Sequence, residues 1–272
     1  MTQNITGLGP KEAEFLITFS SRNKKIFTVK EARSFWEDPN YTTNMLDRLQ
    51  SKGWLRRLER GKYMIVPLEA GPDRNWTESG LVMVPHLIQP AAVAYWSAFH
   101  YWQMSEQIPR TVFVQSTKRK LDNKKEILGI EYRFVKVVDS KFFKNIKRTI
   151  DGKTITVTDR EKTLVDALDR PDLCGGIAHI AHGLDVNWEE LDWDGLDDVL
   201  LKWPTRTPYK RLGYLVETLQ LDIPNRNTRL SKWRNNISSG ISPLEPGHDQ
   251  DQGPIKTRWN LRLNIPINWT EN

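Results

Sequence analysis

The chain has 272 residues, 38% of them hydrophobic, with 40 Lys and Arg against 34 Asp and Glu and a formal net charge of +6. This composition excludes a disordered chain, and the single cysteine, Cys174, excludes a framework of internal disulfides. The charge is uneven, because residues 1–72 carry 12 basic and 8 acidic side chains whereas residues 185–222 carry 4 and 9. The basic start of the chain therefore leaves nucleic acid open as a partner.

The first 70 residues have the pattern of three short helices followed by a basic hairpin. Apolar spacing predicts a helix over residues 11–21, and Thr28 followed by Glu31 forms a capping-box pattern at the start of a second helix. After the turn at residues 38–40, a third helix is predicted from about Tyr41 to Lys52, with Gly53 at its end. Residues 54–58 and 62–66 then predict two strands joined by a short turn. This order is typical of a winged helix-turn-helix.

Polar and basic side chains of this segment are candidate DNA contacts. On the third helix, the side predicted to face away from its core holds Thr42, Thr43, Asn44, Arg48 and Ser51, whose side chains can contact base edges or phosphates. The basic cluster on the hairpin is Arg56, Arg57, Arg60 and Lys62, suited to salt-sensitive backbone contacts. A winged helix that binds protein and carries a solvated basic hairpin remains the alternative.

A Gly-Pro step within Glu69–Asp73 predicts a boundary between domains at residues 1–72 and 73–272. The stretch from Ser79 to Ser105 lacks charged residues, but its prolines and histidines favour a buried strand over 81–84 and a helix that opens at Pro90, not a membrane span. Further strands are predicted at 110–115, 131–138, 154–157 and 258–265, and helices at 159–170, 193–201 and 210–219. Their irregular order predicts an α+β fold, with a larger mixed α/β domain after the winged helix.

No constellation of residues argues strongly for catalysis. Asp166 and Asp169 are three residues apart on a predicted helix and give one alternative, a metal-dependent nuclease, although ion pairs with Lys162 and Arg170 explain them more simply. Cys174, with His179 and His182 nearby, is better explained as structural than as part of a metal or nucleophilic site. We therefore expect a protein that is not an enzyme and needs no cofactor or metal. The acidic block at residues 185–198 is either a solvated face or a surface for a basic partner protein.

Several motifs, in order along the chain, resemble one bacterial family. They are Leu-Glu-Arg-Gly-Lys-Tyr at 58–63 with Val-Pro-Leu-Glu-Ala-Gly at 66–71, Tyr-Trp-Ser-Ala at 95–98, residues 106–114, Glu-Lys-Thr-Leu at 161–164 with Asp166, residues 168–176, residues 210–215 and residues 259–266. Together they resemble the AbiE-type (AbiEi) antitoxins of abortive-infection, type IV toxin–antitoxin systems, over roughly residues 10–266.

The resemblance implies a cytoplasmic transcriptional repressor that acts in phage defence. Its winged helix would bind double-stranded DNA at inverted repeats in its own promoter, and its C-terminal antitoxin domain would counteract a nucleotidyltransferase-like toxin, directly or indirectly. The residues that match the third helix and the hairpin inherit the DNA-contact role as candidates: Thr42, Thr43, Asn44, Arg48, Arg56, Arg57, Arg60 and Lys62. No motif assigns the C-terminal residues that counteract the toxin.

Overall fold

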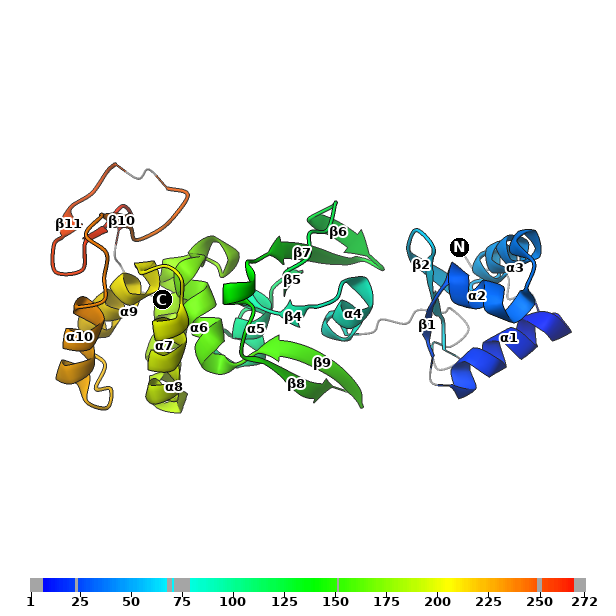
Figure 1. The fold of residues 1–272 in the computed structure, drawn as a ribbon, viewed down its shortest axis with the longest axis horizontal. Helices are drawn as coiled ribbons and strands as arrows, with labels where there is room; N and C mark the ends of the chain where they lie inside the picture. The colour runs from blue at the N-terminus through cyan, green and yellow to red at the C-terminus, as the bar shows by residue number, and fades with distance from the viewer. Residues whose placement is uncertain are drawn as a thin grey trace. The chain divides into compact units, whose positions relative to one another are not determined.

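The computed structural model describes residues 7–22, 24–67, 70, 79–150, 152–248 and 251–266. The chain divides into two compact units, which we call the N-terminal unit (Met1–Ser79 with Glu126–Gly129) and the C-terminal unit (Gly80–Lys125 with Ile130–Asn272) (Figure 1). Apart from Ala70, the boundary predicted at Glu69–Asp73 lies outside the described residues. Helices and strands are mixed in both units, so the fold class is α+β.

Three helices and a three-stranded antiparallel sheet form the N-terminal unit. Its elements are α1 (Pro10–Ser21), β1 (Ile26–Thr28), α2 (Val29–Trp36), α3 (Pro39–Ser51), β2 (Leu55–Glu59) and β3 (Lys62–Ile65), with sheet order β1-β3-β2. Phe15, Phe27 and Leu49 are among the fully buried side chains that fill its core. The element order is consistent with a winged helix-turn-helix, in which α2 and α3 are the helix-turn-helix and the β2–β3 hairpin is the wing.

Local capping signals position the helices of this unit. The Glu31 backbone N–H donates to Thr28 Oγ1 at 3.3 Å while the Thr28 N–H donates to Glu31 Oε2 at 2.7 Å, which confirms the predicted capping box of α2. The Asp38 carboxylate accepts from the N–H groups of Asn40 and Tyr41, so the predicted turn is the N-cap of α3. These caps determine where each helix of the motif begins.

A six-stranded mixed sheet, in the order β6-β7-β5-β4-β9-β8, is the framework of the C-terminal unit, and only Glu126 and Ile127 of its edge strand β6 fall within the N-terminal unit. Its strands are β4 (Ala92–Val93), β5 (Thr111–Ser116), β6 (Lys124–Ile127), β7 (Ile130–Lys136), β8 (Asn145–Ile150) and β9 (Lys153–Thr158). Strands β5 and β7 pair in parallel, and so do β4 and β9. A small sheet near the end of the chain joins β10 (Ser242–Pro243), β12 (Leu261–Arg262) and β11 (Ile255–Lys256).

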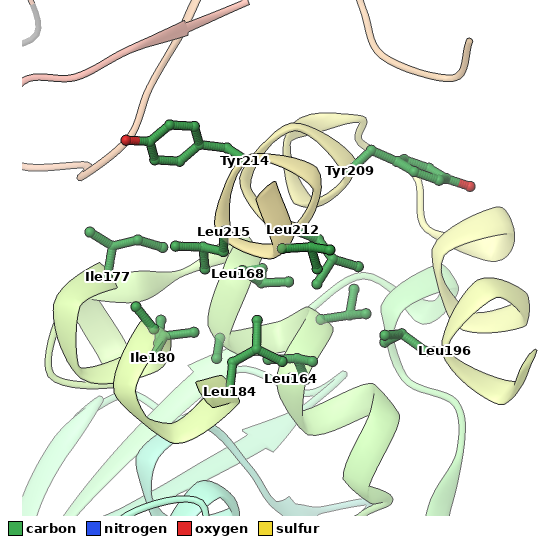
Figure 2. Close-up of a cluster of buried hydrophobic side chains, with 14 of the residues drawn as sticks. Leu164, Leu168, Ile177, Ile180, Leu184, Leu196, Tyr209, Leu212, Tyr214 and Leu215 are labelled. Carbon is green, nitrogen blue, oxygen red and sulfur yellow. The ribbon is translucent and has the colours of Figure 1, made fainter. Parts of the chain in front are cut away.

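Helices cover the sheet and form the main core of this unit. They are α4 (Gly80–Leu87), α5 (Tyr95–Tyr101), α6 (Arg160–Asp169), α7 (Ile177–Asn187), α8 (Trp193–Lys202), α9 (Thr207–Thr218) and α10 (Arg226–Arg234). Leu164 and Leu168 of α6, Ile180 of α7, and Leu212 and Leu215 of α9 belong to one cluster of fully buried side chains (Figure 2). The central helix α6 thereby packs against α5, α7, α8 and α9, which determines the surroundings of its charged side chains.

Three sequence predictions were wrong in this unit. The helix predicted to open at Pro90 begins only at Tyr95, because Ala92 and Val93 pair with β5 as strand β4. Residues 81–84 lie in helix α4, not in a strand, because a short, wholly apolar run has no periodicity that separates a buried helix from a buried strand. The strand predicted over 258–265 is reduced to Leu261–Arg262. Within the described part of the chain, no helix is both long and apolar enough to cross a membrane.

Candidate nucleic-acid interface

Helix α3 presents a polar face to solvent. Met45, Leu46 and Leu49 anchor the helix in the core, and Thr43, Asn44 and Ser51 are exposed as predicted. The Thr43 hydroxyl donates to the Pro39 carbonyl at 2.9 Å and the Ser51 hydroxyl to the Arg48 carbonyl at 2.8 Å. Their oxygen lone pairs stay available as acceptors, whereas the Asn44 amide offers both donors and an acceptor toward solvent.

Thr42 is the member of the predicted set that the structure places elsewhere. It is fully buried, and its hydroxyl donates to the Asp38 carbonyl at 2.7 Å. Thr42 precedes Met45 and Leu46 by three and four positions, so it shares their buried face. Its expected place on the outer side of α3 was therefore wrong, and its role in this unit is structural.

A buried carboxylate of α1 positions Arg48 on the polar face of α3. Glu12 of α1 lies 3.5 Å from Arg48 Nε and accepts from Lys52 Nζ at 2.6 Å and from the Gly9 N–H at 2.7 Å. Burial raises the pKa of Glu12, but the hydrogen bonds from Lys52 and Gly9 and the nearby positive charges outweigh it and hold the pKa below its ordinary value. The Arg48 side chain is still 61% exposed, so it is positioned by Glu12 without being withdrawn from solvent.

The wing carries its four predicted cations with unequal exposure. Arg57 and Arg60 are exposed, while Arg56 and Lys62 are half-buried. Lys62 Nζ lies 3.9 Å from Glu59 Oε2, and a bulge between Arg57 and Glu59 interrupts the strand register. Because Leu55 and Leu58 are the buried side chains of β2, the arginines between and after them remain at the surface.

The turn of the wing lies beside the start of α2. The Val29 N–H donates to the Gly61 carbonyl at 2.9 Å, and Thr28 is paired with Lys62 across β1 and β3. Two exposed cations of α2, Lys30 and Arg33, belong to the same motif and were not among the predicted contacts. Neither was the exposed Asp47, although its spacing of three residues from Asn44 places it on the same face of α3.

Each of the two aspartates that the nuclease alternative requires accepts a hydrogen bond from a lysine side chain. Asp166 is 2% exposed and accepts from the fully buried Lys162 at 2.6 Å, and Asp169 accepts from Lys141 at 2.5 Å. Burial raises the pKa of Asp166 to about 6 against the opposing charge of Lys162. A buried carboxylate held in this way is a structural element of α6, and the described residues include no group of three or more His, Cys, Asp or Glu able to hold a metal ion.

Much of the acidic block is used within the C-terminal unit. Arg229 of α10 pairs with Asp194 and Asp197, each at 2.5 Å, and Asp197 also accepts from Trp233 Nε1 at 2.6 Å. Asp192 is the N-cap of α8. These carboxylates attach α10 to α8, whereas Asp185, Glu189 and Asp198 of the same block are exposed, so a surface for a basic partner protein stays a prediction.

The remaining chemical candidates have ordinary surroundings. Cys174 is fully buried, and burial raises the pKa of its thiol well above the usual value. The His179 ring is half-buried with its centroid 5.1 Å from that of Trp96, and burial lowers its pKa. His182 is exposed. None of these contacts resembles a nucleophile paired with a base.

Comparison with known proteins connects this geometry to a family. Residues 14–66, from α1 to the end of the wing, match the family described as transcriptional regulator, AbiEi antitoxin. No curated protein matches the chain. The crystal structure of the RV2827C protein from Mycobacterium tuberculosis is similar with a TM-score of 0.64 and 16% identity, covering 95% of this chain and 93% of that chain. The family resemblance is thus confirmed over the winged helix, and the fold is shared with a solved protein.

Proposed function

We propose, from the AbiEi family match of the N-terminal unit, that this chain is a DNA-binding transcriptional repressor and the antitoxin of a toxin–antitoxin pair. It would bind double-stranded DNA at inverted repeats in its own promoter and so regulate its own operon. Its C-terminal unit would counteract a nucleotidyltransferase-like toxin, directly or indirectly, in defence against phage. The chain would act as a cytoplasmic regulator without catalysis of its own.

The DNA-binding part of this proposal rests on the polar face of α3 and the basic wing of the same unit. In a winged helix, the helix enters the major groove and the wing contacts the backbone. Asn44 and Arg48 supply the donors and acceptors that distinguish base edges, and Asp47 can accept from a cytosine amino group. Arg57 and Arg60 supply charge without sequence information. Thr43 and Ser51 can bind phosphate only by rotating their hydroxyls away from carbonyls of the helix.

Removing the two exposed wing cations should weaken DNA binding on every sequence. We expect Arg57→Ala with Arg60→Ala to reduce the slope of log affinity against log salt by about 1–2, because each phosphate contact contributes about 0.9. Fluorescence anisotropy of a labelled duplex from the region upstream of the coding sequence measures this over a range of salt concentrations.

The matched control is Arg234→Ala, which removes an exposed arginine from α10 of the other unit. It should leave both affinity and slope unchanged. If the wild-type chain failed to bind the upstream duplex at low salt, the DNA-binding half of the proposal would be refuted. An unchanged slope in the wing variant would refute the role of the wing.

The antitoxin part of the proposal is tested by measuring bacterial growth. A nucleotidyltransferase-like gene beside this one should arrest growth when expressed alone, and co-expression of this chain should restore it. Expressing that gene under a promoter that this protein does not bind separates neutralisation from repression. If growth stayed arrested under that promoter, the chain would be a repressor without antitoxin activity.

A further inference from the structure

A strongly basic cleft is lined entirely by residues of the C-terminal unit. Its volume is about 580 Å³. Six cations line it: Lys118, Arg119, Lys120, Arg133, Lys136 and Arg170. Among the described residues that line the cleft, none is acidic. The whole chain has a net charge of only +6, so the positive charge density of this cleft is far above the average for the surface of the protein.

The cleft is formed where two neighbouring parallel strands end. Ser116 and Lys136 are paired as the last residues of β5 and β7, and the Val137 N–H donates to the Ser116 carbonyl at 2.9 Å. The chain after β5 then returns beside β7, where the Phe134 N–H donates to the Asn123 carbonyl at 2.7 Å. Because parallel strands present their carboxyl ends at one edge, the basic segment 118–120 is brought beside Lys136.

Some of the cations are fixed and others are open to solvent. Lys120 donates to the Leu87 carbonyl at 2.7 Å, and Arg170 is held by both oxygens of Asp172 at 2.7 and 2.8 Å. Lys118, Arg119 and Lys136 are exposed, and within the described part of the chain they make no ion pair. Mutual repulsion among these charges is therefore only partly offset by protein groups.

One apolar side chain accompanies these charges. Leu121, which follows the basic segment directly, is 96% exposed and lines the cleft. An isolated exposed leucine is ordinary on a protein surface, but in a basic hollow it gives the site an apolar contact next to its cations. Phosphate groups beside a flat organic group match that combination.

We propose that this cleft binds the phosphate groups of a free nucleotide, of the nucleoside polyphosphate class. Several linked phosphoryl groups place their charges close together and can be reached at once by Arg119, Arg133 and Lys136, with the nucleoside over Leu121. A volume of about 580 Å³ is typical of a small-molecule site, so the cleft can enclose a nucleotide but not a DNA duplex. A single strand offers only one charge for each nucleotide, so it satisfies fewer of the converging cations.

Titration calorimetry of the full chain at low salt tests this with ATP, GTP and inorganic tripolyphosphate, each without DNA. We expect saturable binding of one nucleoside triphosphate per chain, with tripolyphosphate weaker because it lacks the Leu121 contact. The variant Arg119→Ala with Lys136→Ala should lose about tenfold or more in affinity, since it removes two charge-assisted contacts. Both side chains are exposed, so thermal unfolding should show an unchanged fold.

The control is Lys147→Ala with Arg148→Ala, which removes two exposed cations from β8 at the opposite edge of the same sheet. It should bind the nucleotide as the wild type does. Absence of binding, or an equal loss in the control, would overturn the proposal. So would tighter binding of a short single-stranded oligonucleotide than of the triphosphate, because the cleft would then hold a nucleic-acid backbone.

Discussion

Thr42 and Arg48 differ by six positions on one helix, yet only Arg48 reaches solvent. Polarity alone predicted both as surface residues. The helical period assigns Thr42 to the face of Met45 and Leu46, and the Asp38 carbonyl satisfies its hydroxyl there. At the scale of single residues, the set of candidate DNA contacts is therefore reduced by Thr42 and extended by Asp47, Lys30 and Arg33.

The charge of Glu12 should make the N-terminal unit sensitive to acid. Its pKa in the folded state is lowered below the ordinary 4.5, so the stability that it contributes is present above that value and is lost as the pH falls through the lower, folded-state pKa. Glu12→Gln should cost about 1–3 kcal/mol at neutral pH, because hydrogen bonds to a charged group are lost. Urea unfolding from pH 7 to pH 3, followed by a probe in this unit, measures both effects.

Glu14→Gln is the control, because Glu14 is exposed on the same helix. The free energy of unfolding of the Glu14→Gln variant should depend on pH as that of the wild type does. An acid response in Glu12→Gln as steep as that of the wild type would show that other carboxylates dominate.

At the scale of elements, the helices with clear local signals were predicted and those without them were not. The capping box at Thr28 marked α2, and Asp159, whose carboxylate accepts from the Lys162 N–H at 2.7 Å, marked α6. Helix α7 was not predicted because it contains Gly183, and glycine is unfavourable in a helix. Packing requires glycine at this position, because a side chain there would clash with the Phe99 ring. Helix α10 buries only Leu230 and Trp233 among its apolar side chains, and the ion pairs of Arg229 hold it in addition.

The missed strands have a different explanation. Strands β6 and β8 lie at the two edges of the sheet, and their exposed side chains include Lys124 and Lys147. Charged edge strands prevent pairing with other chains, but they lack the apolar alternation that sequence patterns detect. The basic cleft was missed for a related reason, since its cations come from three separated segments that only the sheet topology brings together.

The buried pair Lys162–Asp166 on α6 should be costly to break and cheap to replace. Lys162 Nζ also lies 4.8 Å from the Trp203 ring centroid, so it is enclosed on several sides. Lys162→Met alone leaves a buried carboxylate without its partner and should cost about 3–5 kcal/mol. Adding Asp166→Leu should recover most of that loss. Urea unfolding of both variants measures the difference.

The comparison is Arg160→Met on the same helix, which breaks the partly exposed pair between α6 and Glu190, a residue outside that helix. It should cost about 1 kcal/mol or less. A double variant no more stable than Lys162→Met would mean that the pair has a role beyond mutual charge compensation.

In the whole molecule, the two units have separate hydrophobic cores. The candidate DNA-binding face belongs to the N-terminal unit, and the basic cleft belongs to the C-terminal unit. The sequence patterns located the winged helix, its wing and most of the face of α3, because helix periodicity and basic clusters are local features. The C-terminal unit depends on contacts between distant segments, such as α10 with α8 and the end of β5 with that of β7. Its core was therefore predictable only in part, and its chemical surfaces were not.

If α3 reads a DNA sequence, as proposed, then replacing one of its base-contacting side chains should change the sequence preference of binding. Binding of the wild-type chain and of Asn44→Ala to the upstream duplex, and to duplexes with single base-pair changes in its repeats, should be compared by anisotropy. We predict that Asn44→Ala loses discrimination at one base pair of each repeat, by about 1–3 kcal/mol, and keeps its salt slope. A uniform loss on every duplex, or no preference of the wild type for its own upstream region, would show that α3 does not read the sequence.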